Sequence, residues 1–103
     1  MSTQIVTIFR SRLNPGVEGE YSEVAGRMTD LARGMPGYVE HKSFRADDGE
    51  RVTIVTFADQ RSHDAWREHP DHIAAQHAGR DSFYSEYRVQ VAGVLRRYEF
   101  RTD

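Results

Sequence analysis

The segment Ile5-Val6-Thr7-Ile8-Phe9 constrains the fold most, because it is apolar and largely β-branched on both faces of an extended chain. It predicts a strand that runs on toward Leu13 and stops at Asn14-Pro15-Gly16. A strand that is apolar on both faces belongs in a sheet covered on two sides. The rest of the chain must supply at least one of the two covering layers.

Two helical patterns can form one such layer. Between residues 21 and 35, apolar side chains recur at spacings of three and four, which predicts an amphipathic helix with Asn14 or a nearby residue as its cap. A second helix is expected to begin at a cap, Asp59 or Ser62. Pro70 interrupts this helix and suits the first position of a new helical piece.

Three further strand patterns lie around these helices. They cover Tyr38–Phe44, Val52–Phe57 and a long last strand from Tyr87 to Phe100. Asp47-Asp48-Gly49 is typical of the tight turn in a hairpin. The first two of these strands are therefore predicted to pair with each other.

The resulting order, β-α-β-β-α-β, predicts an α+β domain with the ferredoxin-like split-βαβ arrangement, filling residues 1–103 as a single domain. Its antiparallel sheet carries two helices on one face. Two helices cannot cover both faces, so the simplest solution is a homodimer packed sheet to sheet. In that dimer the long last strand would reach into the partner.

Composition excludes several classes of function. The net charge of −2 gives no support for nucleic-acid binding, and the absence of cysteine excludes disulfides and thiolate catalysis. No apolar run approaches the ~18 residues that span a bilayer, and the N-terminus carries no signal-peptide pattern, so we expect a cytoplasmic protein without a membrane partner. Phosphate-binding loops, nucleophile elbows and dinucleotide fingerprints are also missing.

Several segments together resemble the antibiotic biosynthesis monooxygenase domain family, a branch of the dimeric α/β-barrel superfamily. The Pro-Gly that opens the second strand and the tryptophan of the second helix are its sharper marks. The resemblance runs from about Ile5 to Phe100 and rests on Ile5-Val6-Thr7-Ile8-Phe9, Met35-Pro36-Gly37-Tyr38, Asp48-Gly49, Val52-Thr53-Ile54-Val55-Thr56-Phe57, Trp66-Arg67-Glu68-His69-Pro70-Asp71-His72, Phe83-Tyr84 and Val89-Gln90-Val91.

This resemblance implies a homodimer with a pocket between sheet and helices in each subunit. Some members are cofactor-independent oxygenases that oxidise anthrone-type polycyclic phenols to quinones with molecular oxygen. We therefore expect a monooxygenase that acts on a flat aromatic or phenolic small molecule and O2 and needs no cofactor or metal. The fold transfers well to this chain, whereas the reaction transfers poorly.

The resemblance also implies that Trp66, the single tryptophan, lines the pocket as a flat wall with one N–H donor. The alternative is a core tryptophan that anchors its helix to the sheet. Histidine titrates near neutral pH and suits proton abstraction from a phenol, so His72 or His77 is expected to assist deprotonation.

Further substrate contacts are expected from aromatic and imidazole side chains: Phe9, His41, His69, Phe83 and Tyr87. For the aromatic residues the alternative is an ordinary core role. Side-chain alternation predicts that His41 lies on the face opposite to Tyr38 and Phe44. His63 and His69 also fit a polar, partly solvated helix surface.

Two alternatives to the oxygenase remain. One is a haem-binding or haem-degrading protein with His77 or His72 as the iron ligand. In the haem-degrading branch the histidine follows the tryptophan by ten residues, where this chain has Gln76, and Phe9 replaces an asparagine of the first strand. The other is a non-catalytic module that uses the same pocket to bind a small ligand.

Overall fold

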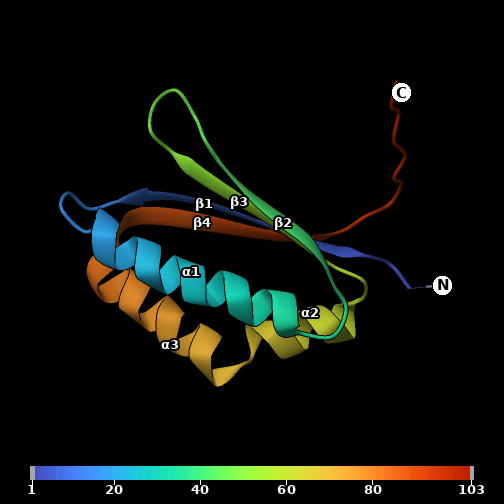
Figure 1. Cartoon of the computed structure of the whole chain (residues 1–103), viewed down its shortest axis with the longest axis horizontal. Coiled ribbons are helices and arrows are strands. Elements are labelled where there is room, and N and C mark those ends of the chain that lie inside the picture. The colour runs from blue at the N-terminus through green and yellow to red at the C-terminus, as the bar shows by residue number, and fades with distance from the viewer. Residues whose placement is uncertain (1, 103) are drawn as a thin grey trace.

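A four-stranded antiparallel sheet with helices on one face makes up the computed structural model, which describes residues 2–102 (Figure 1). The strand order is β2-β3-β1-β4, which confirms the α+β, ferredoxin-like prediction. The elements are β1 (Ile5–Leu13), α1 (Glu18–Gly34), β2 (Tyr38–Arg45), β3 (Arg51–Phe57), α2 (Gln60–Arg67), α3 (Pro70–Ala78), a π-helical turn η1 (Gly79–Phe83) and β4 (Tyr84–Gly93). In the part of the chain that the structure describes, every helix is too short or too polar to cross a lipid bilayer.

The register of the sheet assigns each side chain of β1 to one of two faces. Thr7 pairs with Val55 and Phe9 with Thr53, and paired residues of antiparallel strands point to the same side. Because Thr7 bonds a histidine of α2, this row faces the helices. The alternate residues of β1, among them Ile8 and Arg10, face the other side.

The core lies between the sheet and the helices. Its buried members are Ala32 of α1, Val55 and Phe57 of β3, and Trp66 of α2, with Met35 and Tyr38 packed against them. Phe57 has no exposed surface, and its ring lies 5.2 Å from the Trp66 ring between centroids. This cluster holds α2 and the end of α1 on the sheet.

Helix ends agree with the sequence expectations in two of three cases. Asp59 caps α2 by accepting a hydrogen bond from the Ser62 N–H at 2.8 Å, and Pro70 stands at the start of α3 as expected. Asn14 does not cap α1: the N-cap position is Val17, and no side chain bonds the first turn, so the expected side-chain cap was wrong. The helix begins at Glu18 after a turn through Gly16, whose φ of 83° is left-handed, and Asn14 instead bonds the backbone carbonyl of Ser82.

The last strand is shorter at its end than predicted. It begins at Tyr84, directly after η1, and stops at Gly93, which pairs with Ile5 at the start of β1. One further backbone hydrogen bond joins the Val94 N–H to the Gln4 carbonyl oxygen at 2.9 Å, and the expected strand to Phe100 does not form. Residues 94–102 instead leave the body of the molecule, with Leu95 exposed to 99% (Figure 1).

A β-bulge in β2 changes the face on which two side chains lie. Tyr38 pairs with Phe57 and Glu40 with Thr56, so Val39 is an extra residue. As a result Tyr38 and His41 lie on the same side, and the Tyr38 hydroxyl is 2.7 Å from His41 Nδ1. The predicted opposition of His41 and Tyr38 was therefore wrong.

Candidate active site

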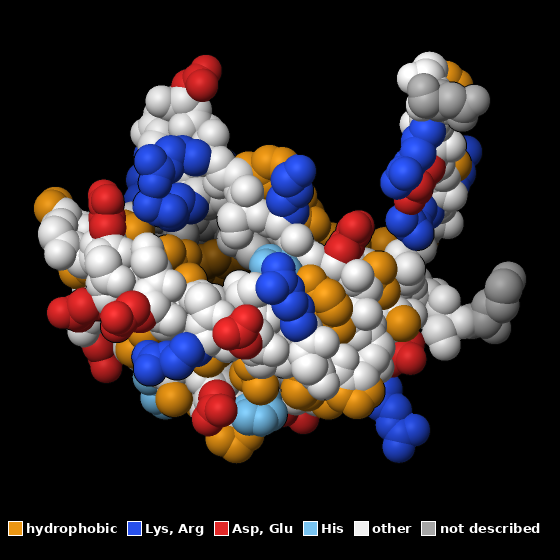
Figure 2. Space-filling model, in the orientation of Figure 1, with side chains coloured by type: hydrophobic (Ala, Val, Ile, Leu, Met, Phe, Trp, Pro, Cys, Tyr) orange, Lys and Arg blue, Asp and Glu red, His pale blue; other side chains and the backbone are white. Residues whose placement is uncertain are grey.

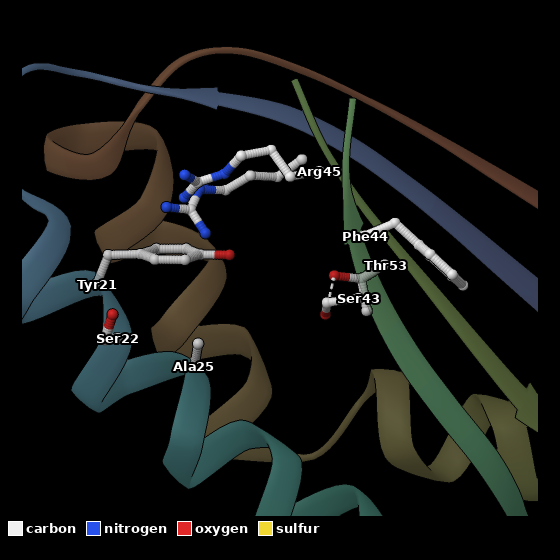
Figure 3. A pocket seen from close by; sticks show the side chains of 8 residues that line it. Tyr21, Ser22, Ala25, Ser43, Phe44, Arg45 and Thr53 are labelled. Atoms are coloured by element: carbon white, nitrogen blue, oxygen red, sulfur yellow. Dashed lines mark hydrogen bonds between the residues drawn. The ribbon is translucent and has the colours of Figure 1, made fainter. Parts of the chain in front are cut away.

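The sheet and α1 enclose a cavity of about 340 Å³ beside the β2–β3 hairpin. Figure 2 shows it as a hollow between the helices and the hairpin, with basic side chains above it. The lining residues come from the first turns of α1 and from the facing strands, and are Tyr21, Ser22, Ala25, Ser43, Phe44, Arg45, Arg51 and Thr53. In Figure 3 the Tyr21 and Arg45 side chains point into the cavity, and the Phe44 ring points away from it.

Two arginines of this lining were not singled out from the sequence. Arg45 and Arg51 are direct partners in the β2–β3 register, and the Arg51 guanidinium carbon lies 5.6 Å from the centre of the Tyr21 ring. The hairpin turn at residues 47–49 supplies the signal that would have found them, because a tight turn centred there sets residues 45 and 51 opposite each other.

An aromatic cluster adjoins the cavity through Tyr21. The Tyr21 ring lies 5.8 Å from Tyr84 and 6.0 Å from Phe83, and Phe9 contacts both Tyr84 and Tyr87 at 5.3 and 5.6 Å. Three expected substrate contacts, Phe9, Phe83 and Tyr87, therefore belong to one cluster. Burial raises the pKa of the Tyr84 phenol well above its usual range, so this hydroxyl stays protonated.

Trp66 lies in the core at the other end of the same sheet face. Its ring is 4.4 Å from His72 and 6.0 Å from His63 between centroids. Only 8% of Trp66 is exposed, and its Nε1 is a buried donor without a hydrogen-bond partner. Such an unpaired donor costs about 1–3 kcal/mol, which makes it a candidate point of contact for a ligand.

His63 is the residue of this group that sequence reasoning misplaced. It is 3% exposed, so the expected solvated surface position was wrong. Its Nδ1 lies 2.9 Å from the Asp64 carboxylate and its Nε2 lies 3.1 Å from the Thr7 hydroxyl. A carboxylate only accepts, so Nδ1 carries the proton in the neutral ring and the Thr7 hydroxyl donates to Nε2. The spacing of three residues between His63 and Trp66 was the available signal, because it sets both on one helix face.

His72 packs its ring against Trp66 from the first turn of α3. Its Nδ1 lies 3.3 Å from the Arg67 carbonyl oxygen, an acceptor, so the proton of the neutral ring is on Nδ1 and the lone pair is on Nε2. Burial lowers the pKa of His72 below its usual value. The ring is thus neutral near pH 7, with Nε2 able to accept a proton.

The three other histidines have separate surroundings. His77 is exposed on α3. His69 caps α3 by accepting the Asp71 N–H at 3.1 Å. His41 is part-buried between the cavity and the core cluster, where it contacts Thr29 and Tyr38. The structure therefore brings His72 to Trp66, whereas His77 lies exposed on α3 and His69 lies at the start of that helix.

The same geometry bears on whether the chain could hold a metal ion or a haem. Across residues 2–102 no three His, Asp or Glu side chains form a group that could hold a metal ion. Neither His72 nor His77 lines the cavity, and His72 is already packed against the tryptophan ring. These positions give the haem alternative no support.

The family model described as antibiotic biosynthesis monooxygenase matches residues 4–78, most of the chain. The chain belongs to the antibiotic biosynthesis monooxygenase family. The uncharacterised protein YqjZ of Bacillus subtilis is 37% identical over 83 residues, which are 81% of this chain and 73% of that protein. These matches confirm the resemblance found in the sequence.

Solved structures share the fold of this family member at low identity. SnoaB of Streptomyces nogalater, described as a cofactor-independent oxygenase, superposes with a TM-score of 0.77 at 19% identity, covering 94% of this chain and 97% of SnoaB. Rv0793 of Mycobacterium tuberculosis superposes with a TM-score of 0.82 at 16% identity, covering 93% and 99% of the two chains. At such identities the superpositions establish the fold alone.

Proposed function

We propose that this chain is a cofactor-independent monooxygenase that oxidises a flat phenolic small molecule of the anthrone type with O2. Family membership and the description of SnoaB support the reaction class. The observation that carries the proposal is the group formed by Trp66 and His72, in which a buried N–H donor without a partner lies beside a neutral imidazole. A donor and a base are the two groups that phenol or anthrone deprotonation requires.

His72 is the base in this proposal. Its Nε2 takes a proton from the acidic C–H of the substrate, and the Trp66 N–H stabilises the negative charge that develops on the substrate oxygen. The carbanion then gives its electrons to O2 and forms a C–O bond, which leaves a peroxide that takes up the proton held by His72. Loss of water from the resulting hydroperoxide gives the ketone of the quinone. The balance is CH₂ + O₂ → C=O + H₂O.

His63 positions the tryptophan. Its two ring nitrogens are already engaged by Asp64 and Thr7, so it has no free lone pair for the substrate. Its buried ring instead contacts Trp66 and fixes the orientation of the indole. Removal of His63 would alter catalysis through Trp66.

The cavity supplies the entrance in this proposal. Thr53 lines the cavity, and Val55, two residues along β3, belongs to the core cluster that contains Trp66. His41 lies between the two regions, so a ring system that extends from the cavity toward Trp66 would contact it. The Phe9, Phe83 and Tyr87 cluster forms the aromatic flank of the same entrance.

Oxygen uptake with anthrone tests this function. His72→Asn keeps a donor toward the Arg67 carbonyl and removes the base, and His77→Asn is the matched control on the exposed side of the same helix. We expect chelator-treated wild-type protein and the control to consume oxygen well above spontaneous oxidation, and His72→Asn to lose about a hundredfold or more. Uptake that is unaffected by His72→Asn, or absent in the wild type, contradicts the proposal.

The enzyme is proposed to work as a homodimer. On the sheet face away from the helices, Val6, Ile8, Val52 and Ile54 are only partly buried, and Phe44 is 49% exposed. No helix covers this face in Figure 1, and a second copy packed sheet to sheet would bury it. A monomeric mass at micromolar concentration in analytical ultracentrifugation contradicts the dimer.

A further inference from the structure

The cavity beside the hairpin holds an excess of positive charge. Arg45 and Arg51 face each other across the β2–β3 ladder on the side of the helices. Cα atoms of directly opposed residues in an antiparallel pair are only about 4.5–5.5 Å apart, and like charges placed this way destabilise a sheet. An anion between the two guanidinium groups would remove this repulsion.

The chain itself supplies no such anion in the described residues. No carboxylate of residues 2–102 lies within ion-pair distance of Arg45 or Arg51, and the cavity lining contains no Asp or Glu. Arginines on the opposite sheet face differ in this respect. Arg10 pairs with Glu50 at 2.8 Å, and Arg12 pairs with both Asp48 and Glu86. Among these four arginines of β1 and the hairpin, the two that face the cavity are thus the ones without a carboxylate partner in the described chain.

The remaining lining groups favour a small aromatic anion. The Tyr21 ring lies under Arg51, and its hydroxyl points into the cavity (Figure 3). Ser43 and Thr53 bond each other at 2.8 Å, which leaves one hydroxyl proton of the pair free to donate. The volume of about 340 Å³ lies at the lower end of the range of small-molecule sites. Paired guanidinium groups match the two oxygens of a carboxylate.

We propose that this cavity binds the carboxylate of a flat aromatic acid, with Arg45 and Arg51 as its anion-binding residues and Tyr21 as the wall against which the ring lies. The assignment of this acid as the substrate rests on the proposed oxygenase function, whereas binding at the cavity does not. Anchoring the carboxylate there directs the ring system along the sheet face toward His41 and Trp66.

The probe is anthracene-9-carboxylate, with uncharged anthracene-9-methanol as its isostere. The fluorescence of the anthracene ring reports binding without any turnover. A failure of the oxygenase proposal in the oxygen-uptake test therefore leaves the binding test valid, and the reverse also holds. We expect the carboxylate to bind at least about tenfold more tightly than the alcohol at low salt, and added salt to reduce this preference.

Variants locate the site. Arg45→Gln/Arg51→Gln is expected to lose the preference for the carboxylate by about tenfold or more while it keeps the affinity for the alcohol. Arg51→Lys keeps the charge without the planar fork and should lose part of the preference. Arg27→Gln, an exposed arginine of α1 outside the cavity, is the control of equal charge and should bind like wild type.

Each outcome decides the proposal. Equal affinity for the acid and the alcohol overturns it. So does a carboxylate preference that survives in Arg45→Gln/Arg51→Gln, or one that Arg27→Gln reduces equally. Thermal unfolding of each variant verifies that folded proteins are compared. If the double variant fails to fold, the loss of carboxylate preference in Arg51→Lys tests the proposal instead.

Discussion

Replacement of Thr7 by valine tests the buried hydrogen bond that orients His63. Thr7 is 7% exposed in the centre of β1, and its hydroxyl is 3.1 Å from His63 Nε2. Valine keeps the β-branched shape and the strand preference of threonine and removes only the hydroxyl. His63 Nε2 then remains buried without a partner, because His63 is itself 3% exposed.

The expected cost follows from that burial. A buried polar atom that loses its partner costs about 1–3 kcal/mol, since water cannot replace the missing group. For a domain of this size, 1 kcal/mol corresponds to a fall in Tm of roughly 4–8 °C. Thr7→Val should therefore lower Tm by at least about 4 °C, with the valine methyl recovering a small part of the loss.

Thr53→Val is the matched control on the neighbouring strand. Thr53 also faces the helices and also bonds a side chain, Ser43, but this bond is exposed and water can replace it. We expect it to cost less than about 0.5 kcal/mol in urea unfolding at pH 8. A Thr7→Val variant that is no less stable than Thr53→Val refutes the assigned role of Thr7 as the partner of His63.

Three other predictions concern the backbone, the charge of His72 and the chain end. Gly37→Ala should destabilise the protein in urea more than Gly16→Ala, because both glycines are left-handed but only the Gly37 position would press a methyl group against Ser62. Because burial lowers the pKa of His72 in the folded state, the unfolded chain binds more protons on acidification. Stability should therefore be complete above the unfolded pKa of about 6.5 and fall as pH drops toward the folded pKa, and His72→Asn should remove this component from the pH dependence of unfolding. Truncation after Val94 should weaken dimerisation, measured by sedimentation, without lowering the stability of the monomeric core, and unchanged dimer affinity contradicts a role of the tail in the partner contact.

Sequence reasoning succeeded here where the side chains of one segment decide its structure. The apolar stripe of α1, the alternating β3 and the Asp59 cap are all local patterns, and each appears in the structure. It failed where the structure of a segment depends on a neighbouring strand that is distant in the sequence. The alternating pattern up to Phe100 is present, but β4 ends at Gly93, where its register with β1 ends, and only the Val94 N–H makes one more bond, to Gln4.

The candidate site was predictable in part for the same reason. Trp66 and His72 come together because Pro70 starts α3 directly after α2 and folds it back onto the tryptophan. His63 was misplaced because histidine is only intermediate in its tendency to be buried, and the bonds to Asp64 and, across to β1, to Thr7 make that burial tolerable. The face of His41 depended on one extra residue in β2, which no periodic pattern reveals.

The two outer strands of the sheet also bear on how molecules of this protein meet. An open strand edge invites pairing with another chain and so leads to aggregation. Here β2 is interrupted by the bulge at Val39 and carries Glu40 and Lys42, while β4 carries Glu86 and Arg88. Both edges thus disfavour the addition of a strand from another molecule. The proposed association through the sheet face away from the helices would be closed by a twofold axis, so it would stop at two copies instead of growing into a fibre.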